Sequence, residues 1–150
     1  MFSHLKLLDE SDLDWVMQIE RQNYTHPWTR AGFERAIHEG LNYLLMDLNN
    51  SALGYCCLLP VLDELHLLNL SVAVNNQNKG VAKQALQAIF NRFENTEYSV
   101  VLLEVRRSNK AARQLYKTMG FEQDGVRKNY YQCSTGERED AILMSKRLDA

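Results

Sequence analysis

The sequence has few of the residues that mark chains outside the ordinary globular class. Only 7 of its 150 residues are glycine and 2 are proline, which excludes collagen-like and low-complexity chains. Its 17 basic and 19 acidic residues give a formal charge of −2, so no excess of positive charge favours a direct nucleic-acid partner. It has no run of about 18 apolar residues that could cross a bilayer, so we expect no membrane partner.

Cysteine is scarce as well. Cys56, Cys57 and Cys133 form no C-x-x-C pair, and an odd number of cysteines does not suggest a disulfide framework. Cys56 and Cys57 lie in an apolar run, which predicts small hydrophobic side chains rather than metal ligands. The four histidines are scattered, so we expect no metal. Reduced thiols and the lack of a signal-peptide pattern in residues 1–14 predict a cytoplasmic protein.

The apolar pattern predicts a single α/β domain covering residues 1–150. Expected strands lie at 2–8, 43–46, 53–59, 65–74, 99–105, 121–131 and 138–148. The first expected helix starts after the acidic cluster 9–12. Three more are expected at about 29–37, 81–93 and 108–120. The order is therefore β-α-α-β-β-β-α-β-α-β-β. Residues 99–105 are almost continuously apolar, which predicts a strand buried on both faces.

A turn between a strand and the helix at 81–93 is the first candidate binding site. It reads QNKGVA over Gln77–Ala82. Unpaired amides and the helix dipole make such a helix start suitable for phosphate or pyrophosphate. Gly80 has no side chain to block close approach, and Ala82 is small. The segment has neither a G-K-[ST] nor a G-x-G-x-x-G pattern, and an ordinary strand-to-helix turn is an alternative explanation.

Two spacings resemble signatures of the GNAT superfamily of N-acetyltransferases. The first is Gln77-x-x-Gly80-x-Ala82, and the second is the segment from Asn109 to Phe121 with Ala112, Leu115, Tyr116 and Gly120 between them. The resemblance extends along essentially the whole chain. It implies a GNAT fold, a single domain with a central mixed sheet, and acetyl-CoA as co-substrate.

Further segments resemble one branch of the superfamily, the bacterial ribosomal-protein-alanine N-acetyltransferases of the RimI type. They are VLDE at 61–64, NLSV at 69–72, LLEVRRSN at 102–109, RKNYY at 127–131 and REDAILM at 138–144. This branch acetylates the N-terminal alanine of ribosomal protein S18. The chain departs from the pattern at Ala82, at Asn75 and Asn76, and by the added Glu137. These departures concern the identity of the acceptor more than the acetyl-transfer chemistry.

The resemblance supplies two candidate catalytic residues. Glu104 interrupts an apolar run, and the residues alone favour an ion pair with Arg106, Arg107 or a basic group on another strand. The resemblance implies that Glu104 is the general base, acting directly or through water. Tyr116 lies on an apolar helix stripe and on spacing alone is a core aromatic. The resemblance implies that it is the general acid that protonates the coenzyme sulfur.

The resemblance also implies a coenzyme site. Its residues are Leu70, Ser71, Val72, Gln77, Asn78, Lys79, Gly80, Val81, Ala82 and Asn109. The strand residues would contribute backbone contacts to the pantetheine arm. Asn109 has a sufficient alternative role as a helix cap.

Candidates for acceptor binding are Asp63, Glu64, Tyr130 and Tyr131, with Trp28 near the same entrance. The acidic pair could attract an ammonium group but could equally be ordinary exposed carboxylates. The tyrosines could line a peptide groove or simply pack on a strand. Two further functions stay open beside N-terminal alanine acetylation. One is acetylation of a small amine, an amino acid or an internal lysine, and the other is a non-catalytic acetyl-CoA-binding module.

Overall fold

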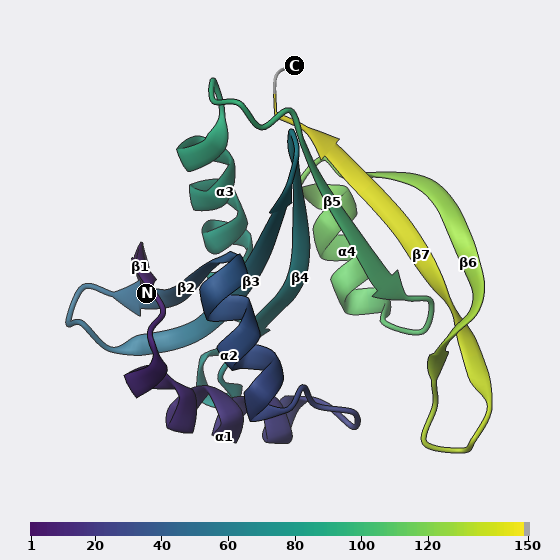
Figure 1. Cartoon of the computed structure of the whole chain (residues 1–150), viewed down its shortest axis with the longest axis horizontal. Helices are drawn as coiled ribbons and strands as arrows, with labels where there is room; N and C mark the ends of the chain where they lie inside the picture. The colour runs from purple at the N-terminus through teal and green to yellow at the C-terminus, as the bar shows by residue number, and fades with distance from the viewer. Residues whose placement is uncertain (149–150) are drawn as a thin grey trace.

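The computed structural model describes residues 1–148, in which a seven-stranded sheet carries helices on both faces (Figure 1). The strands are β1 (Phe2–Leu7), β2 (Leu41–Asp47), β3 (Ala52–Val61), β4 (Glu64–Val72), β5 (Val100–Arg106), β6 (Glu122–Gln132) and β7 (Arg138–Arg147). The helices are α1 (Leu13–Asn23), α2 (Arg30–Glu39), α3 (Val81–Phe93) and α4 (Lys110–Thr118). Short 3-10 turns cover Glu10–Asp12 and Val74–Asn76. The predicted order of strands and helices is confirmed.

Polar side chains fix the starts of the helices. The Asp9 carboxylate accepts a hydrogen bond from the Ser11 amide. Asp9 and Asp12 also form a capping box on the 3-10 turn before α1, in which each side chain accepts from the other residue's backbone amide, at 3.0 Å for the Asp9 amide. Thr29 Oγ1 accepts from the Gly32 amide at 3.1 Å and starts α2. Each such cap contributes about 1 kcal/mol of helix stability. The predicted helix starts at the acidic cluster and at Thr29 are confirmed.

The sheet is mixed. Its strand order is β1-β2-β3-β4-β5-β7-β6, and every neighbouring pair is antiparallel except β4 and β5. A parallel pair requires a long crossover connection, and α3 occupies that connection. The start of α3 therefore follows the end of β4 after one short connection, residues 73–80.

Two hydrophobic cores lie on opposite faces of the sheet. Apolar residues of α3, such as Leu86 and Ile89, lie in the first core together with residues of β5 and β7, and the apolar stripe of α4 packs at its edge. Residues of α1 and α2, such as Val16 and Phe33, form the second core with β2 and β3. Cys56 and Cys57 are buried in the first and second core respectively, so their prediction as small hydrophobic side chains is confirmed.

The burial predicted for β5 is complete on only one of its faces. Val101, Leu103 and Val105 lie in the core with α3, whereas Glu104 and Arg106 on the other face are half-buried. The helices on that other face pack over β2, β3 and β4, so they leave the Glu104 side of β5 bordering a cavity. Within residues 1–148, every helix is too short or too polar to cross a membrane.

Candidate functional site

Strands β4 and β5 separate partway along β4. Their parallel ladder runs from Glu64 opposite Val100 to Leu67 opposite Leu103, and β4 then continues to Val72. Figure 1 shows the two strands together at one end and diverging toward the other. Leu68 lies at the point of divergence and forms a bulge against β3, where the register shifts. Because a bulge bends its strand and increases the local twist, β4 itself directs the opening.

Beyond this bulge, the backbone carbonyls on the open edge of β4 accept hydrogen bonds from side chains and not from a neighbouring strand. The Val72 carbonyl accepts hydrogen bonds from Asn23 Nδ2 and Gln77 Nε2, both at 3.0 Å. The Leu70 carbonyl accepts a weaker one from the Tyr24 hydroxyl at 3.4 Å. These backbone groups therefore face the gap between β4 and β5. An extended ligand could pair with this edge as an added strand does.

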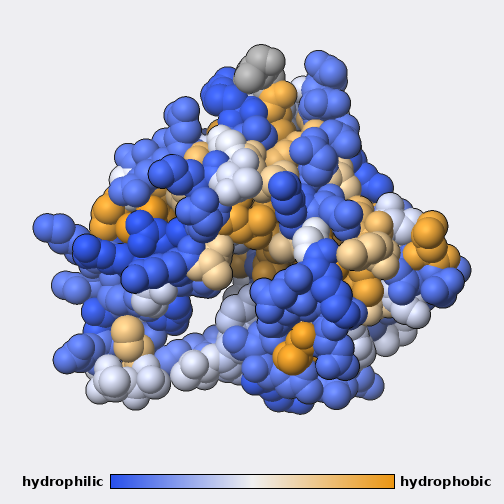
Figure 2. All heavy atoms as spheres, turned by 180° about the vertical axis from the view of Figure 1, so that it is seen from behind, coloured by the Kyte–Doolittle hydropathy of each residue, from blue (hydrophilic) through white to orange (hydrophobic). Residues whose placement is uncertain are grey.

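Two cavities meet in the gap. The first, of 590 Å³, lies between the α1–α2 connection, β5, α4 and the β6–β7 hairpin. The second, of 600 Å³, lies between the end of β4, the start of α3 and α4. Seen from behind, the surface is hollowed near its centre, where the sheet opens (Figure 2). Both cavities are lined by Asn23, Tyr24, Leu70, Asn109 and Ala112. We call the first the acceptor cavity and the second the coenzyme cavity.

The start of α3 forms one wall of the coenzyme cavity. Gly80 is the N-cap, adopts the left-handed conformation with φ of 79°, and provides no side-chain cap. The first amides of α3 have no intrahelical acceptor, and a Cβ placed on Gly80 would meet nothing within 4 Å. This is the geometry of an anion site made of backbone amides at a helix start. The space and donors fit a pyrophosphate, and the positive φ gives a physical reason for glycine.

Most of the predicted coenzyme residues line this cavity. They are Leu70, Ser71, Val72, Gln77, Asn78, Gly80, Val81, Ala82 and Asn109. Lys79 is exposed and does not line it. The cap interpretation of Asn109 is confirmed, because its Oδ1 accepts from the Ala112 amide at 3.1 Å. Asn109 also lines both cavities, so capping and ligand contact are compatible at this position.

Glu104 and Tyr116, the two predicted catalytic residues, both line the acceptor cavity. Glu104 Oε1 lies 3.6 Å from Arg127 Nε of β6, so the ion pair with another strand that the residues alone favoured is present. Tyr116 projects from α4 and packs against Phe121 with ring centroids 5.5 Å apart. Burial raises the pKa of Tyr116 well above its ordinary value, so its hydroxyl stays protonated and can donate a hydrogen bond into the cavity.

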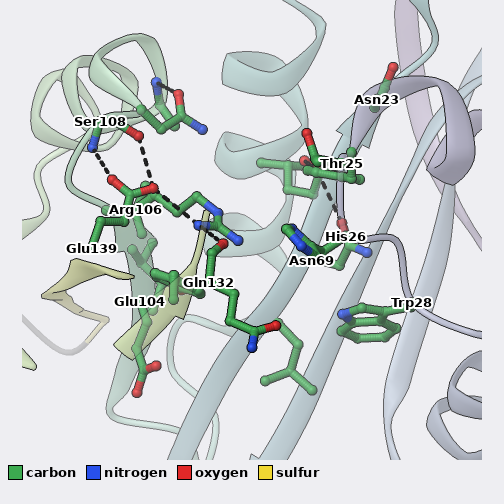
Figure 3. Close-up of a pocket in the computed structure, with 18 of the residues that line it drawn as sticks. Asn23, Thr25, His26, Trp28, Asn69, Glu104, Arg106, Ser108, Gln132 and Glu139 are labelled. Carbon is green, nitrogen blue, oxygen red and sulfur yellow. Dashed lines mark hydrogen bonds and ion pairs between the residues drawn. The ribbon is translucent and has the colours of Figure 1, made fainter. Parts of the chain in front are cut away.

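The far wall of the acceptor cavity is an ordered polar cluster. Glu139 accepts from Arg106 Nη1 at 3.1 Å, from the Ser108 amide at 3.1 Å and from the Ser108 hydroxyl at 3.0 Å. Burial opposes ionisation of Glu139, but these hydrogen bonds outweigh it and lower its pKa. The Arg106 guanidinium lies over the Tyr131 ring, 4.4 Å from its centroid. Figure 3 shows this cluster on one side of the cavity, with His26 and Trp28 on the other.

The four predicted acceptor residues do not lie together. Tyr131 lines the acceptor cavity, where burial and then the charge of Glu104 raise its pKa to about 12. Tyr130 is 44% exposed, with Arg127 over its ring. Asp63 and Glu64 lie at the paired end of β4, away from the opening, and line neither cavity. Asp63 accepts from the Ser99 hydroxyl at 2.8 Å, and Glu64 faces His66.

Two residues that the sequence analysis did not select also belong to this site. Tyr24 lines both cavities, and the buried carboxylate of Glu20 lines the acceptor cavity. Glu20 shares the helical spacing of Leu13, Val16 and Met17, so a carboxylate on an apolar helix face was a detectable signal. No comparable pattern marks Tyr24. Trp28, expected near the entrance, does line the acceptor cavity.

Known proteins resemble the chain along nearly its whole length. A model of the Acetyltransferase (GNAT) family matches residues 13–121. The [ribosomal protein bS18]-alanine N-acetyltransferase of Haemophilus ducreyi is 32% identical over 143 residues, covering 94% of this chain and 97% of that protein. Its namesake from Escherichia coli strain K12 is 34% identical over 140 residues, covering 92% and 93%.

The comparison of structures agrees. The crystal structure of the ribosomal-protein-S18-alanine N-acetyltransferase from Escherichia coli superimposes with a TM-score of 0.90 at 30% sequence identity. It covers 100% of this chain and 96% of that one. The predicted fold, a mixed α/β sheet of the GNAT type, is therefore confirmed. The chain belongs to the GNAT family of acetyltransferases.

Proposed function

We propose that the protein transfers an acetyl group from acetyl-CoA to the α-amine of the N-terminal alanine of ribosomal protein S18, in the cytoplasm. The observation that carries the proposal is the open end of the β4–β5 pair, where the coenzyme cavity and the acceptor cavity share Asn23, Tyr24, Leu70, Asn109 and Ala112. Relatives named for this activity match the chain over more than nine tenths of both lengths, which supports the acceptor.

The coenzyme cavity supplies what an acyl-coenzyme needs. The backbone amides at Gly80, Val81 and Ala82 would hold the pyrophosphate, because the helix dipole and the unpaired donors both favour negative charge. The open edge of β4 at Leu70 and Val72 would hold the pantetheine arm by backbone hydrogen bonds. The coenzyme, once bound, supplies an acetyl thioester. The edge of β4 would direct that group toward the residues that the two cavities share.

An N-terminal amine suits this site chemically. An α-amine has a reference pKa of about 7.7–8.0, against about 10.4 for lysine, so its neutral fraction near physiological pH is far larger than that of lysine. The assistance required of Glu104 is therefore modest: it accepts a proton from the amine, directly or through water. Tyr116, whose pKa burial raises, donates a proton to the departing sulfur. The direct transfer needs no covalent enzyme intermediate.

The acceptor cavity has the character of a peptide-binding site. Its walls carry a tyrosine and an arginine on β5–β6, and Trp28 with His26 on the α1–α2 connection. A chain terminus entering between these walls would meet Glu104 on β5. Asp63 and Glu64 lie outside this cavity, so we assign acceptor binding to Tyr131 in preference to the acidic pair.

The proposal is tested with purified protein, acetyl-CoA and four acceptors. These are a peptide that begins with the S18 sequence, the same peptide with a blocked N-terminus, a blocked peptide with an internal lysine, and a free polyamine. Mass spectrometry should find one acetyl group on the first peptide alone. Acetylation of lysine or polyamine in preference to the free N-terminus would favour the alternative acceptors. Coenzyme binding without transfer to any of the four would favour a non-catalytic module.

A further inference from the structure

A buried carboxylate on α1 forms hydrogen bonds to two walls of the acceptor cavity, the α1–α2 connection and strand β4. Glu20 of α1 is 1% exposed. Its Oε1 accepts hydrogen bonds from the Asn69 side-chain Nδ2 at 3.0 Å and from the Tyr55 hydroxyl at 2.6 Å. Its Oε2 accepts one from the Trp28 backbone amide at 2.9 Å. All three donors are uncharged groups. A single side chain thus contacts α1's own connection to α2, the middle of β3 and the open part of β4.

Two of these partners belong to the acceptor cavity itself. Trp28 lies on the α1–α2 connection, and Asn69 follows the bulge at Leu68 where β4 leaves β5. The two residues come from elements that share no backbone ladder. Their relative position therefore depends on side-chain bonds, and Glu20 is the group that bonds to both.

The contacts of Asn69 extend to the place where the two cavities meet. Asn69 Oδ1 accepts from the Ser71 hydroxyl at 3.1 Å and from the Tyr24 hydroxyl at 3.4 Å. The hydroxyls of Tyr24 and Ser71 are themselves 2.6 Å apart. Tyr24 lines both cavities. The orientation of the Asn69 amide, fixed by Glu20, therefore sets the hydrogen-bonding direction of the groups beside Leu70.

Packing alone gives little reason for a carboxylate here. A buried carboxylate is costly unless hydrogen bonds compensate its desolvation, and an apolar residue would continue the stripe of Leu13, Val16 and Met17 on α1. An ionised carboxylate, however, accepts several hydrogen bonds at once. No apolar residue could bond Trp28 and Asn69 together.

We propose that Glu20 is a positioning residue for the acceptor amine. It holds the α1–α2 connection and the open strand β4 at the separation that lets a chain terminus reach the acetyl group. The inference rests on the proposed function and goes beyond it, because Glu20 acts through Trp28 and Asn69 without itself contacting the acceptor. It predicts that damage to this hydrogen-bond network weakens use of the acceptor far more than it weakens coenzyme binding.

The test places a second carboxylate against Glu20 and then removes the clash. Asn69→Asp sets two carboxylates at the 3.0 Å contact, where like charges repel. In Glu20→Gln/Asn69→Asp the amide and the carboxylate exchange places, which keeps the net charge, the contact between positions 20 and 69 and an oxygen acceptor for the Trp28 amide, while the Tyr55 hydroxyl must accept from the new amide where it donated before. Misplacement near a reacting group costs up to about 100-fold, and we expect Asn69→Asp to lower kcat/KM for the alanine peptide by about tenfold or more. The double variant should recover most of that loss.

Two further readouts separate positioning from general stability. Hydrogen exchange of the Trp28 amide should speed up in Asn69→Asp and slow again in the double variant, while the Kd for acetyl-CoA stays within about twofold of the original. Asn42→Asp is the matched control, because Asn42 is also a buried asparagine, 4% exposed, with its amide donating to the Ala36 carbonyl at 2.6 Å. It should lower the melting temperature and leave the KM for the peptide unchanged.

The outcomes are distinguishable. Equal losses of kcat/KM in Asn69→Asp and the double variant, or a KM change in Asn42→Asp as large as in Asn69→Asp, would overturn the positioning role. If the unaltered protein acetylates no alanine peptide, the proposed function fails. Trp28 amide exchange then still decides whether Glu20 couples the two walls.

Discussion

Glu104 of β5 and Arg127 of β6 form an ion pair, with 3.6 Å between Oε1 and Nε. Glu104 also lines the acceptor cavity, so the ion pair and a role as proton acceptor are compatible. Their side chains are 31% and 54% exposed, and a pair this accessible to solvent contributes at most about 1 kcal/mol to stability. Glu104 is therefore not required at this position for stability, and its substitution tests the chemistry.

Substitution of Glu104 should slow the reaction without weakening coenzyme binding. Loss of a general base costs about 10²–10⁴-fold in rate, so Glu104→Gln should lower kcat by about 100-fold with the Kd for acetyl-CoA unchanged. Steady-state kinetics and calorimetry measure the two quantities. Arg127→Gln is the matched control, because it breaks the same ion pair and keeps the carboxylate. An equal loss of kcat in both variants would show that the pair, and not the base, is what matters.

The hydroxyl of Tyr116 should matter for turnover and little for packing. Tyr116→Phe keeps the ring contact with Phe121, so we expect an unchanged melting temperature at neutral pH and a kcat lowered by about tenfold or more. Burial raises the pKa of Tyr116 above its ordinary value of 10.0, so loss of this proton should not reduce the wild-type rate below about pH 10.

The same shift has a consequence for stability. The pKa of Tyr116 is higher in the folded protein than in the unfolded chain. The contribution of Tyr116 to the free energy of unfolding is therefore complete below about pH 10 and declines as the pH rises above that value. Urea denaturation at pH 8 and pH 11 measures that decline, which should be smaller in Tyr116→Phe than in the unaltered protein.

Unchanged turnover in Tyr116→Phe would show that this tyrosine has a packing role only.

Substitution of Gly80 should weaken coenzyme binding by more than the strain of a positive φ alone explains. Gly80→Ala keeps φ at 79° only with strain of about 1–2 kcal/mol, and adds a methyl group at the start of α3. Gly136→Ala is a close control, since Gly136 has φ of 87° and equally open surroundings in the β6–β7 hairpin. Calorimetry should find a raised Kd for acetyl-CoA in the first variant only. Equal affinities in the two variants would contradict the pyrophosphate site.

Adjacent tyrosines on β6 offer a test of the acceptor cavity. Tyr131 lines the cavity beneath the Arg106 guanidinium, whereas Tyr130 is 44% exposed. Tyr131→Ala should raise the KM for an alanine peptide by about tenfold, as for loss of one well-packed aromatic contact. Tyr130→Ala should leave the KM unchanged. The assignment is wrong if the two variants change KM by the same factor.

Much of the fold could be predicted because local signals and apolar periodicity agree. Asp9 of the acidic cluster caps the 3-10 turn before α1, and Thr29 and Asn109 cap α2 and α4. The buried face of α3 follows the predicted spacing, with Val81, Leu86 and Phe93 in the core. These features depend on neighbours within one helical turn, which a single sequence displays directly.

The geometry of the opening could not be predicted in the same way. Where β4 leaves β5 depends on the register of two strands far apart in the sequence and on the bulge at Leu68. Without that register, Asp63 and Glu64 were candidates for acceptor binding, and the structure places them at the paired end of β4, away from the opening. The contacts of Glu20 with Tyr55 and Asn69 also join distant segments, and only the folded chain shows them.

Intact-mass spectrometry of the small-subunit ribosomal proteins, from cells with and without this gene, tests the proposed acceptor in its natural setting. Ribosomal protein S18 should lack one acetyl group on its N-terminal alanine when the gene is absent. It should regain that group when the gene is restored but not when the Glu104→Gln form is supplied. An acetyl group that stays on S18 in cells without the gene would contradict the proposed function.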